Sequence, residues 1–150
     1  MTPLLRCTMK MKLNGVEETL LIPLWSRAHI SKEYPSLFND AKAIELVDAI
    51  DYDFSTLEER LNFEYKLSNV VRTKHFDNKI RDFIAEHPHA SVINLGAGLE
   101  TTFYRIDNET IHWYDLDLPE VIDEGMQLHR LSTVGRIRSE QGLLLYSWGV

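Results

Sequence analysis

The apolar positions ahead of residue 90 recur mainly at helical spacing. Asp40 precedes a segment, 41–50, in which Ile44 and Val47 lie about one helical turn apart. Aspartate is a favoured residue at a helix N-cap because its side chain accepts a hydrogen bond from a free backbone amide of the first turn. We therefore predict a helix over 41–50 that begins directly after Asp40.

The long segment that follows is also helical in pattern. Two residue pairs at its start have the spacing of a capping box: Ser55 with Glu58, and Thr56 with Glu59. The helical pattern continues to His87, and Pro88 ends it. Because roughly thirty residues is long for one globular helix, we predict a break between Ser68 and Asp77.

After Pro88 the pattern changes to short apolar runs separated by turn residues. In chain order, the predicted elements are a strand at 92–95, a glycine turn at 96–100, a short helix or irregular turn at 101–106, a strand at 111–117, a helix that begins at Pro119, and a third strand at 143–148. A buried strand that leads into a glycine turn, followed by a strand that ends in acid, is typical of a nucleotide-binding α/β unit.

The composition is that of one globular domain. The chain has 150 residues, of which 44% are hydrophobic and 26% are charged. It carries 23 acidic and 16 basic residues, and this net charge of −7 argues against binding to nucleic acid or to anionic membranes. No apolar run approaches the length of a membrane span. The single cysteine, Cys7, fits a reducing compartment, so we expect a cytoplasmic protein with a loosely ordered leader at 1–15.

The glycine turn narrows the choice of nucleotide. Gly96 and Gly98 occupy two positions of the dinucleotide fingerprint, but Thr101 stands at the third, where glycine normally allows close packing around a pyrophosphate. This difference disfavours an NAD-dependent oxidoreductase and leaves room for a ligand without a diphosphate, such as S-adenosylmethionine. A tight turn without a ligand is the remaining interpretation, and the strands on both sides of the turn weigh against it.

Charged residues near the turn are candidates for contacts with a cofactor. Asp115 and Asp117 can each accept hydrogen bonds from both ribose hydroxyls. We expect at most one of them to do so, and the other to be exposed or to cap the next helix. Arg72 can clamp a carboxylate with two parallel hydrogen bonds, and so can Arg27 and Arg105. The alternative for all three arginines is a surface pair with an acidic residue.

Motifs for metal or covalent chemistry are absent from the sequence. The histidines show no metal-ligand spacing, and the chain has no nucleophile elbow, P-loop or paired-cysteine motif. We therefore predict no metal site and assign no catalytic residue.

Several segments in fixed order resemble the leucine carboxyl methyltransferase family, in particular its bacterial branch of polyketide-type O-methyltransferases. The matching segments are 18–28, 51–54, Arg72-Thr73 with Asp77, 94–102 with Tyr104-Arg105, and 117–122. The resemblance extends from about Val16 to Trp148. It implies an α/β fold of the Rossmann-like class I methyltransferase type, N-terminal half only. Residues 16–150 would form a partial domain, with a helical region at 16–90 before the first strands at 91–148.

The resemblance also implies an activity, a cofactor and site residues. The activity is transfer of a methyl group from S-adenosylmethionine to a carboxylate or hydroxyl oxygen of a small molecule or protein. By position, Arg72 would hold the cofactor's carboxylate, Gly96 and Gly98 would face its methionine and sugar, and Asp117 would bind the ribose. Arg27 would lie near the mouth of the cofactor or substrate site. Methyl transfer to a carboxylate depends mainly on alignment and needs no general base, so the catalytic residues stay unassigned.

The chain also departs from the family pattern. Members are longer, Gly125 stands where an arginine is usual, and Leu145 replaces an aspartate. Without the strand that would pair with 92–95 on its other side, we expect an apolar sheet edge open to oligomerisation or to a partner, and poor folding of the chain alone. A non-catalytic remnant or binding module that keeps part of the fold is therefore a second functional interpretation.

Overall fold

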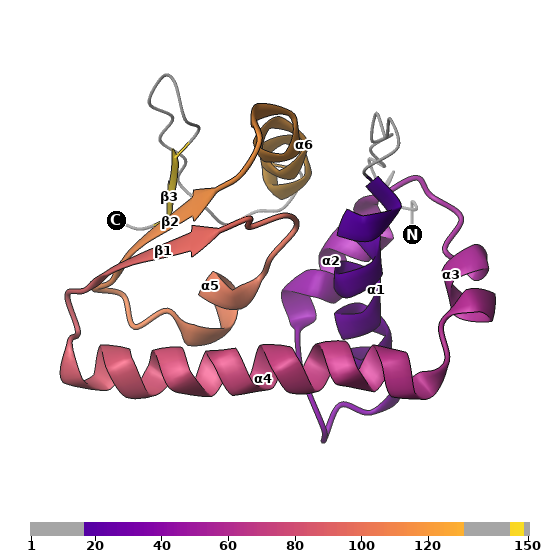
Figure 1. The fold of residues 1–150 in the computed structure, drawn as a ribbon, viewed down its shortest axis with the longest axis horizontal. Coiled ribbons are helices and arrows are strands. Elements are labelled where there is room, and N and C mark those ends of the chain that lie inside the picture. Colours follow the sequence, from indigo (N-terminus) through magenta and orange to yellow (C-terminus); the bar gives the residue numbers. More distant parts are fainter. Residues whose placement is uncertain (1–16, 131–144, 149–150) are drawn as a thin grey trace, which may run out of the picture.

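The computed structural model describes residues 17–130 and 145–148, and it contains both helices and strands (Figure 1). In chain order the elements are α1 (Glu17–Glu33), α2 (Ala41–Ala49), α3 (Ser55–Arg60), α4 (Phe63–Glu86), β1 (Ser91–Leu95), α5 (Thr102–Ile106), β2 (His112–Leu116), α6 (Pro119–Arg130) and β3 (Leu145–Trp148). Helices precede the first strand, as predicted. The predicted leader at 1–15 lies outside the described residues.

The strands form one mixed sheet in the order β1-β2-β3. β1 and β2 are parallel, in register from Ser91 opposite His112 to Leu95 opposite Leu116, and β3 pairs antiparallel with β2. Three strands were predicted and three are present among the described residues. Within that part of the chain, β1 is an edge strand that pairs with β2 alone.

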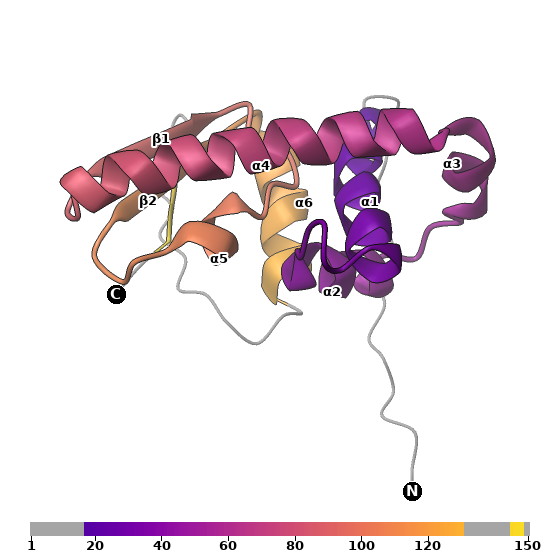
Figure 2. The same cartoon turned by 90° about the horizontal axis from the view of Figure 1, so that it is seen from below.

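The long helix α4 is continuous over its 24 residues, so the predicted break between Ser68 and Asp77 is wrong. The helical pattern breaks earlier, at Leu61 and Asn62, where the Asn62 side chain accepts a 2.9 Å hydrogen bond from the amide of Tyr65 and begins α4. In Figures 1 and 2, one part of α4 lies beside the helical layer formed by α1 and α2, and another part lies beside the sheet. Helix α4 packs against α1 in one part and against the sheet and α5 in another. This packing explains why the helix is continuous, because most helical stability in proteins comes from tertiary packing.

The helix caps agree with the sequence in one case and differ in another. The Asp40 side chain accepts a 2.9 Å hydrogen bond from the amide of Ala43, which confirms Asp40 as the N-cap of α2. The predicted capping box at the start of α3 is wrong. Phe54 is the N-cap residue and makes no side-chain cap, while the Asp53 carboxylate accepts a hydrogen bond from the amide of Ser55.

Two of the three apolar clusters among the described residues share one helix, α6. The first is built around α1 and comprises Leu21, Leu24, Trp25, Ala28, Ala43, Leu46, Ile50, Leu57, Leu99 and Leu128. The second lies against the sheet and comprises Ile84, Ile106, Ile111, Trp113 and Ile122. Because α6 supplies Leu128 to the first core and Ile122 to the second, it ties the sheet to the helical layer.

The two faces of the sheet differ in cover. Trp113 is 2% exposed and packs in the second core, with Val92 against it. On the opposite face of β1, Ile93 is 58% exposed and Leu95 is 71% exposed. Parallel sheets are normally covered on both faces, so the described residues leave one apolar face of β1 open. No helix in the described ranges is both long and apolar enough to cross a membrane.

Candidate functional site

A cavity of about 480 Å³ lies at the carboxyl end of β1, between α1 and α4. Its walls are the N-terminal half of α1, the middle of α4, the end of β1 and the turn that follows. The lining residues include Thr19, Leu20, Pro23, Arg27, Arg72, Thr73, Phe76, Asn94, Gly96, Gly98, Leu99 and Glu100. Four of the five predicted cofactor residues therefore line one cavity, and Asp117 is bonded to its wall.

The turn after β1 requires glycine at two positions. Gly96 has φ +66° and Gly98 has φ +56°, in the left-handed region that L side chains rarely adopt. A Cβ atom added at Gly96 would meet nothing within 4 Å, whereas one at Gly98 would lie 3.2 Å from Leu20 Cδ2. Gly96 thus borders open space in the cavity, and Gly98 lets α1 approach the turn.

The two aspartates of the second strand have different surroundings. Asp117 follows β2, and its carboxylate accepts 2.7 Å hydrogen bonds from the amides of Gly98 and Leu118. Asp115 is 8% exposed and accepts 2.9 Å hydrogen bonds from Asn94 Nδ2 and Trp113 Nε1. The expectation that the second aspartate would be exposed or would cap a helix is therefore wrong for Asp115, which lies in the sheet interior.

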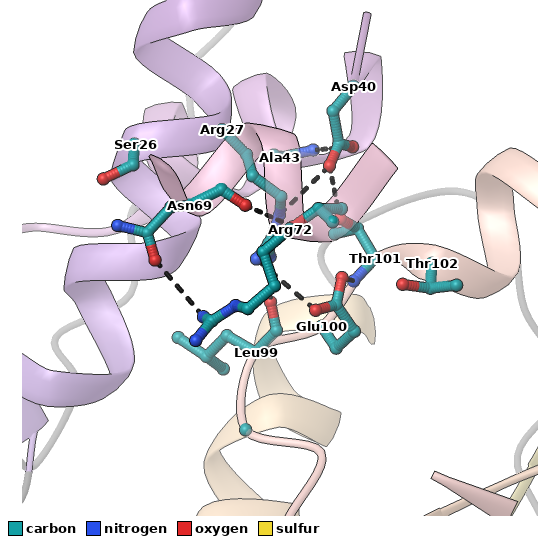
Figure 3. A network of polar contacts seen from close by, with 12 residues as sticks. Ser26, Arg27, Asp40, Ala43, Asn69, Arg72, Leu99, Glu100, Thr101 and Thr102 are labelled. Atoms are coloured by element: carbon teal, nitrogen blue, oxygen red, sulfur yellow. Dashed lines mark hydrogen bonds and ion pairs between the residues drawn. The ribbon is translucent and has the colours of Figure 1, made fainter. Parts of the chain in front are cut away.

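Arg72 lies on α4 with its side chain exposed, and it lines the cavity. Its Nη2 donates a 3.3 Å hydrogen bond to Asn69 Oδ1, one turn earlier on the same helix (Figure 3). This contact is long and its acceptor is neutral, so the guanidinium can take a stronger, negatively charged partner.

Arg27 lies in the interior, 2% exposed, and its three nitrogen atoms have different partners. Nε faces Asp40 Oδ2 at 3.2 Å, Nη2 donates to the Leu99 carbonyl at 2.9 Å, and Nη1 lies 3.5 Å from Glu100 Oε2 (Figure 3). Arg27 therefore fastens α1 to the end of the glycine turn. The alternative of a surface ion pair is wrong for this arginine, since its pairs are buried.

Arg105 is the centre of a buried group of charges, which we call the Arg105 cluster and which consists of Arg27, Asp40, Asp77, Glu100 and Arg105. Arg105 binds Asp77 through Nε at 2.7 Å and Nη2 at 3.0 Å, and its Nη1 binds Asp40. Thr101 Oγ1 also donates to Asp40. The threonine that replaces the third glycine is thus fully buried and joins the glycine turn to the N-cap of α2.

The charges within the cluster stabilise one another. Burial by itself raises the pKa of Glu100, but Arg27, Arg105 and hydrogen bonds from Thr101 and Thr102 outweigh it and hold the pKa below its ordinary value. Burial by itself lowers the pKa of Arg105, but its bonds to Asp77 and the nearby carboxylates raise the pKa above its ordinary value. Both groups are therefore ionised at neutral pH.

Sequence reasoning missed most of this cluster. From the sequence, Asp40 was predicted only as a helix N-cap, and no structural or binding role was predicted for Asp77 or Glu100. One signal was present: Asn69, Thr73 and Asp77 recur every four residues and form a polar stripe on a buried face of α4. Such a stripe indicates polar partners across the interface, although it does not say which ones. Among the residues that the structure describes, no three His, Cys, Asp or Glu side chains are grouped as metal ligands.

The fold and the cavity define an α/β protein with a candidate ligand site at the carboxyl ends of its parallel strands. Residues 21–135 match the leucine carboxyl methyltransferase family, and the chain belongs to this family. The family resemblance noted in the sequence is therefore confirmed.

Two curated proteins are similar over most of the chain. The tetracenomycin polyketide synthesis O-methyltransferase TcmP of Streptomyces glaucescens is 37% identical over 121 residues, which are 79% of this chain and 43% of that protein. The S-adenosyl-L-methionine-dependent methyltransferase dpfgK of Gibberella zeae is 31% identical over 121 residues, which are 75% of this chain and 41% of that protein. The match spans less than half the length of either relative. No solved structure matches the chain.

Proposed function

We propose that this chain is the cofactor-binding part of an S-adenosylmethionine-dependent O-methyltransferase with a Rossmann-like class I fold. The observation that supports this most is the cavity at the carboxyl end of β1, which is lined by a positive-φ glycine turn and Arg72 and has Asp117 hydrogen-bonded to the turn. Open α/β sheets bind ligands at this end of their strands. The relatives add the chemistry, since both are named methyltransferases.

The residues around the cavity fit this cofactor. The exposed guanidinium of Arg72 suits a methionine carboxylate, and the open space beside Gly96 leaves room for the methionine or sugar. Asp117 lies next to the turn with its carboxylate half-buried, where it can accept hydrogen bonds from ribose hydroxyls. Arg27, on α1, stabilises the turn through its contacts with the Leu99 carbonyl and the Glu100 carboxylate.

When bound, S-adenosylmethionine supplies an electrophilic methyl group, whose bond to sulfur breaks as a bond to the acceptor oxygen forms. The residues of this chain bind the cofactor and orient it, which is the main requirement of such a transfer. A carboxylate acceptor is already deprotonated at neutral pH, whereas a hydroxyl acceptor needs a base. We propose an acceptor that is a small molecule or a group that bears a carboxylate, and no residue is assigned as catalytic.

The remaining sequence predictions belong to the same proposal. Residues 16–150 form part of one methyltransferase domain, helical over 16–90 and with strands over 91–148, after a leader at 1–15. The net charge of −7 supports a protein that does not bind nucleic acid or anionic membranes, and the single cysteine supports a cytoplasmic location. Within the described part of the chain, the unpaired edge and uncovered face of β1 offer a contact for a second copy or a partner.

Calorimetric titration with S-adenosylmethionine, S-adenosylhomocysteine and NAD tests the proposal. We expect both methyltransferase ligands to bind and NAD not to bind. Arg72→Ala and Asp117→Ala should each weaken binding by about tenfold or more, because each removes a charge-assisted contact.

Arg81→Ala is a matched control for Arg72→Ala. Arg81 lies on the same helix, bonds at 3.3 Å to an asparagine three residues earlier and does not line this cavity, but it also donates a 2.9 Å bond to the Arg105 carbonyl, so the stability of both variants is measured alongside. Binding of NAD alone would favour the oxidoreductase interpretation. Binding of none of the three ligands would favour the non-catalytic remnant.

A further inference from the structure

We propose that Glu100 binds the α-ammonium group of the cofactor's methionine moiety, so that Arg72 and Glu100 together recognise the zwitterionic amino acid. This inference rests on the proposed function and assigns a contact within the same cavity. It is supported by the charge balance of the Arg105 cluster, by the exposure of Glu100 and by the hydrogen bonds of its two carboxylate oxygens.

The Arg105 cluster has a net charge of −1, because it contains one more carboxylate than guanidinium groups. Among the described residues it contains three carboxylates, from Asp40, Asp77 and Glu100, and two guanidinium groups, from Arg27 and Arg105. A buried charge without compensation is costly. The ammonium of Lys42 does not join these pairs, since it bonds with Glu45 at 3.2 Å.

In the cavity at the carboxyl end of β1, Glu100 is the one carboxylate of the cluster that a ligand can reach. The side chains of Asp40 and Asp77 are 0% and 3% exposed, whereas that of Glu100 is 25% exposed. Glu100 also lines the cavity at the carboxyl end of β1, and Asp40 and Asp77 do not. A ligand cation in this cavity can therefore reach the cluster through Glu100.

Glu100 has one short hydrogen bond from the backbone, a side-chain hydrogen bond from Thr102, and two longer contacts with arginines, of which Arg105 Nη2 lies 3.4 Å from Oε1. Oε1 accepts a 2.8 Å hydrogen bond from the amide of Thr101, which fixes the position of the carboxylate. Oε2 has Arg27 Nη1 at 3.5 Å, at the outer limit of hydrogen bonding. A ligand ammonium at normal distance would form a stronger, charge-assisted bond to this carboxylate, which the nearby arginines keep ionised at neutral pH.

Besides the buried guanidinium of Arg27, the cavity thus has an exposed cationic group, Arg72, and a partly exposed carboxylate, Glu100, for the two ends of an amino acid. Arg72 approaches it from α4, and Glu100 approaches it from the turn after β1 (Figure 3). A guanidinium recognises a carboxylate and a carboxylate recognises an ammonium group. A nucleoside that lacks this amino acid would make neither contact, so its affinity should not depend on Arg72 or Glu100. The proposal can therefore be tested by comparing ligands with and without the amino acid.

The test is calorimetric titration of the full chain with three ligands: S-adenosylhomocysteine, its analogue that lacks the amino group, and 5′-methylthioadenosine, which lacks the amino acid. In the wild-type chain, loss of the amino group should weaken binding by about tenfold. Glu100→Gln should weaken binding of S-adenosylhomocysteine by a similar factor and leave 5′-methylthioadenosine unchanged. Glu100→Asp should restore part of the affinity.

Asp77→Asn is the control for a general charge effect, because it removes the same charge from the cluster at a position outside the cavity. It should weaken the three ligands equally or not at all. The proposal is overturned if Glu100→Gln weakens S-adenosylhomocysteine and 5′-methylthioadenosine by equal factors, or if the wild-type chain does not distinguish the analogue that lacks the amino group. Absence of binding of all three ligands to the wild-type chain overturns the proposed function itself.

Discussion

The backbone amide of Gly98 donates a 2.7 Å hydrogen bond to Asp117 Oδ2, and this bond joins the turn after β1 to the end of β2. Hydrogen bonds from an amide to a carboxylate are charge-assisted and stronger than bonds between neutral groups. On its other side, the turn is close to α1 through Leu20. Gly98, in the wall of the cavity, therefore contacts both the sheet, through Asp117, and helix α1, through Leu20.

Alanine substitutions at the two glycines of the turn should have different consequences. Gly98→Ala should lower the free energy of unfolding by more than Gly96→Ala, as measured by urea denaturation. Both variants force a left-handed φ on alanine, at a cost of about 1–2 kcal/mol, but only Gly98→Ala adds a 3.2 Å contact with Leu20. Gly96→Ala should instead weaken cofactor binding, because its Cβ enters the cavity. Equal stability of the two variants would contradict this account of the turn.

Asp40 should be among the residues on which stability depends most. Asp40→Ala removes the N-cap of α2 and breaks one buried ion pair each of Arg27 and Arg105, which then keep only Glu100 and Asp77 as charged partners. We expect the free energy of unfolding to fall by about 3–5 kcal/mol, as for other broken buried ion pairs. Asp48→Ala is the control, since it breaks a more exposed pair with Lys32 and should change stability by at most about 1 kcal/mol.

Restoring the third glycine of the fingerprint should not create a dinucleotide site. Thr101→Gly removes the buried hydroxyl that bonds to Asp40, and it should lower stability by about 1–3 kcal/mol. Thr101→Ser keeps the hydroxyl and should lose less. Calorimetry with NAD should show no binding to either variant. A gain of NAD affinity in Thr101→Gly would mean that the threonine, rather than the surrounding fold, excludes a pyrophosphate.

Stability should fall with decreasing pH in two steps. The pKa of His29 is lowered by burial and by the charge of Lys66, against weaker opposite effects of Glu58 and Glu33. The unfolded state therefore binds the proton more readily, and stability present above the unfolded pKa of about 6.5 is lost as the pH falls below it. The lowered pKa of Glu100 has the same sign, and its contribution is lost below its unfolded pKa of about 4.3.

Urea denaturation at a series of pH values tests both steps of this pH dependence. His29→Gln should flatten the first step, between about pH 7 and pH 5, and leave the second in place. A variant that retains the full slope between those pH values would assign the first step to another group.

The open face of β1 should promote self-association. Ile93 is 58% exposed on an edge strand of the described sheet, and such strands are templates for pairing with another chain. Ile93→Lys should therefore reduce association measured by light scattering across a concentration series. Leu118→Lys is the control, because Leu118 is 60% exposed but lies outside the strands. A wild-type chain that remains monomeric and melts in one sharp transition would contradict the prediction.

Elements that depend on near neighbours could be predicted from the sequence. The strand after Pro88, the glycine turn, the cap at Asp40 and the helix start at Pro119 all follow from contacts within a few residues. Steric limits on backbone angles and short-range hydrogen bonds decide such features, so one sequence contains the necessary information. Gly96, Gly98 and Asp117 were also identifiable because they follow strands whose ends meet at one edge. Arg27 and Arg72, in contrast, lie on helices and were indicated by the family resemblance.

The tertiary structure alone decided the features that join distant segments. The continuity of α4 depends on packing against elements on both sides, and no local pattern contains those neighbours. The burial of Asp115 and the pairing of Asp40 with Thr101, which is 61 positions away, depend on partners from other elements. The energy of a buried charge is decided by what surrounds it in space. The sequence therefore determined where the glycine turn lies and to which family the chain belongs. Only the tertiary structure determined which buried charges hold the turn in place.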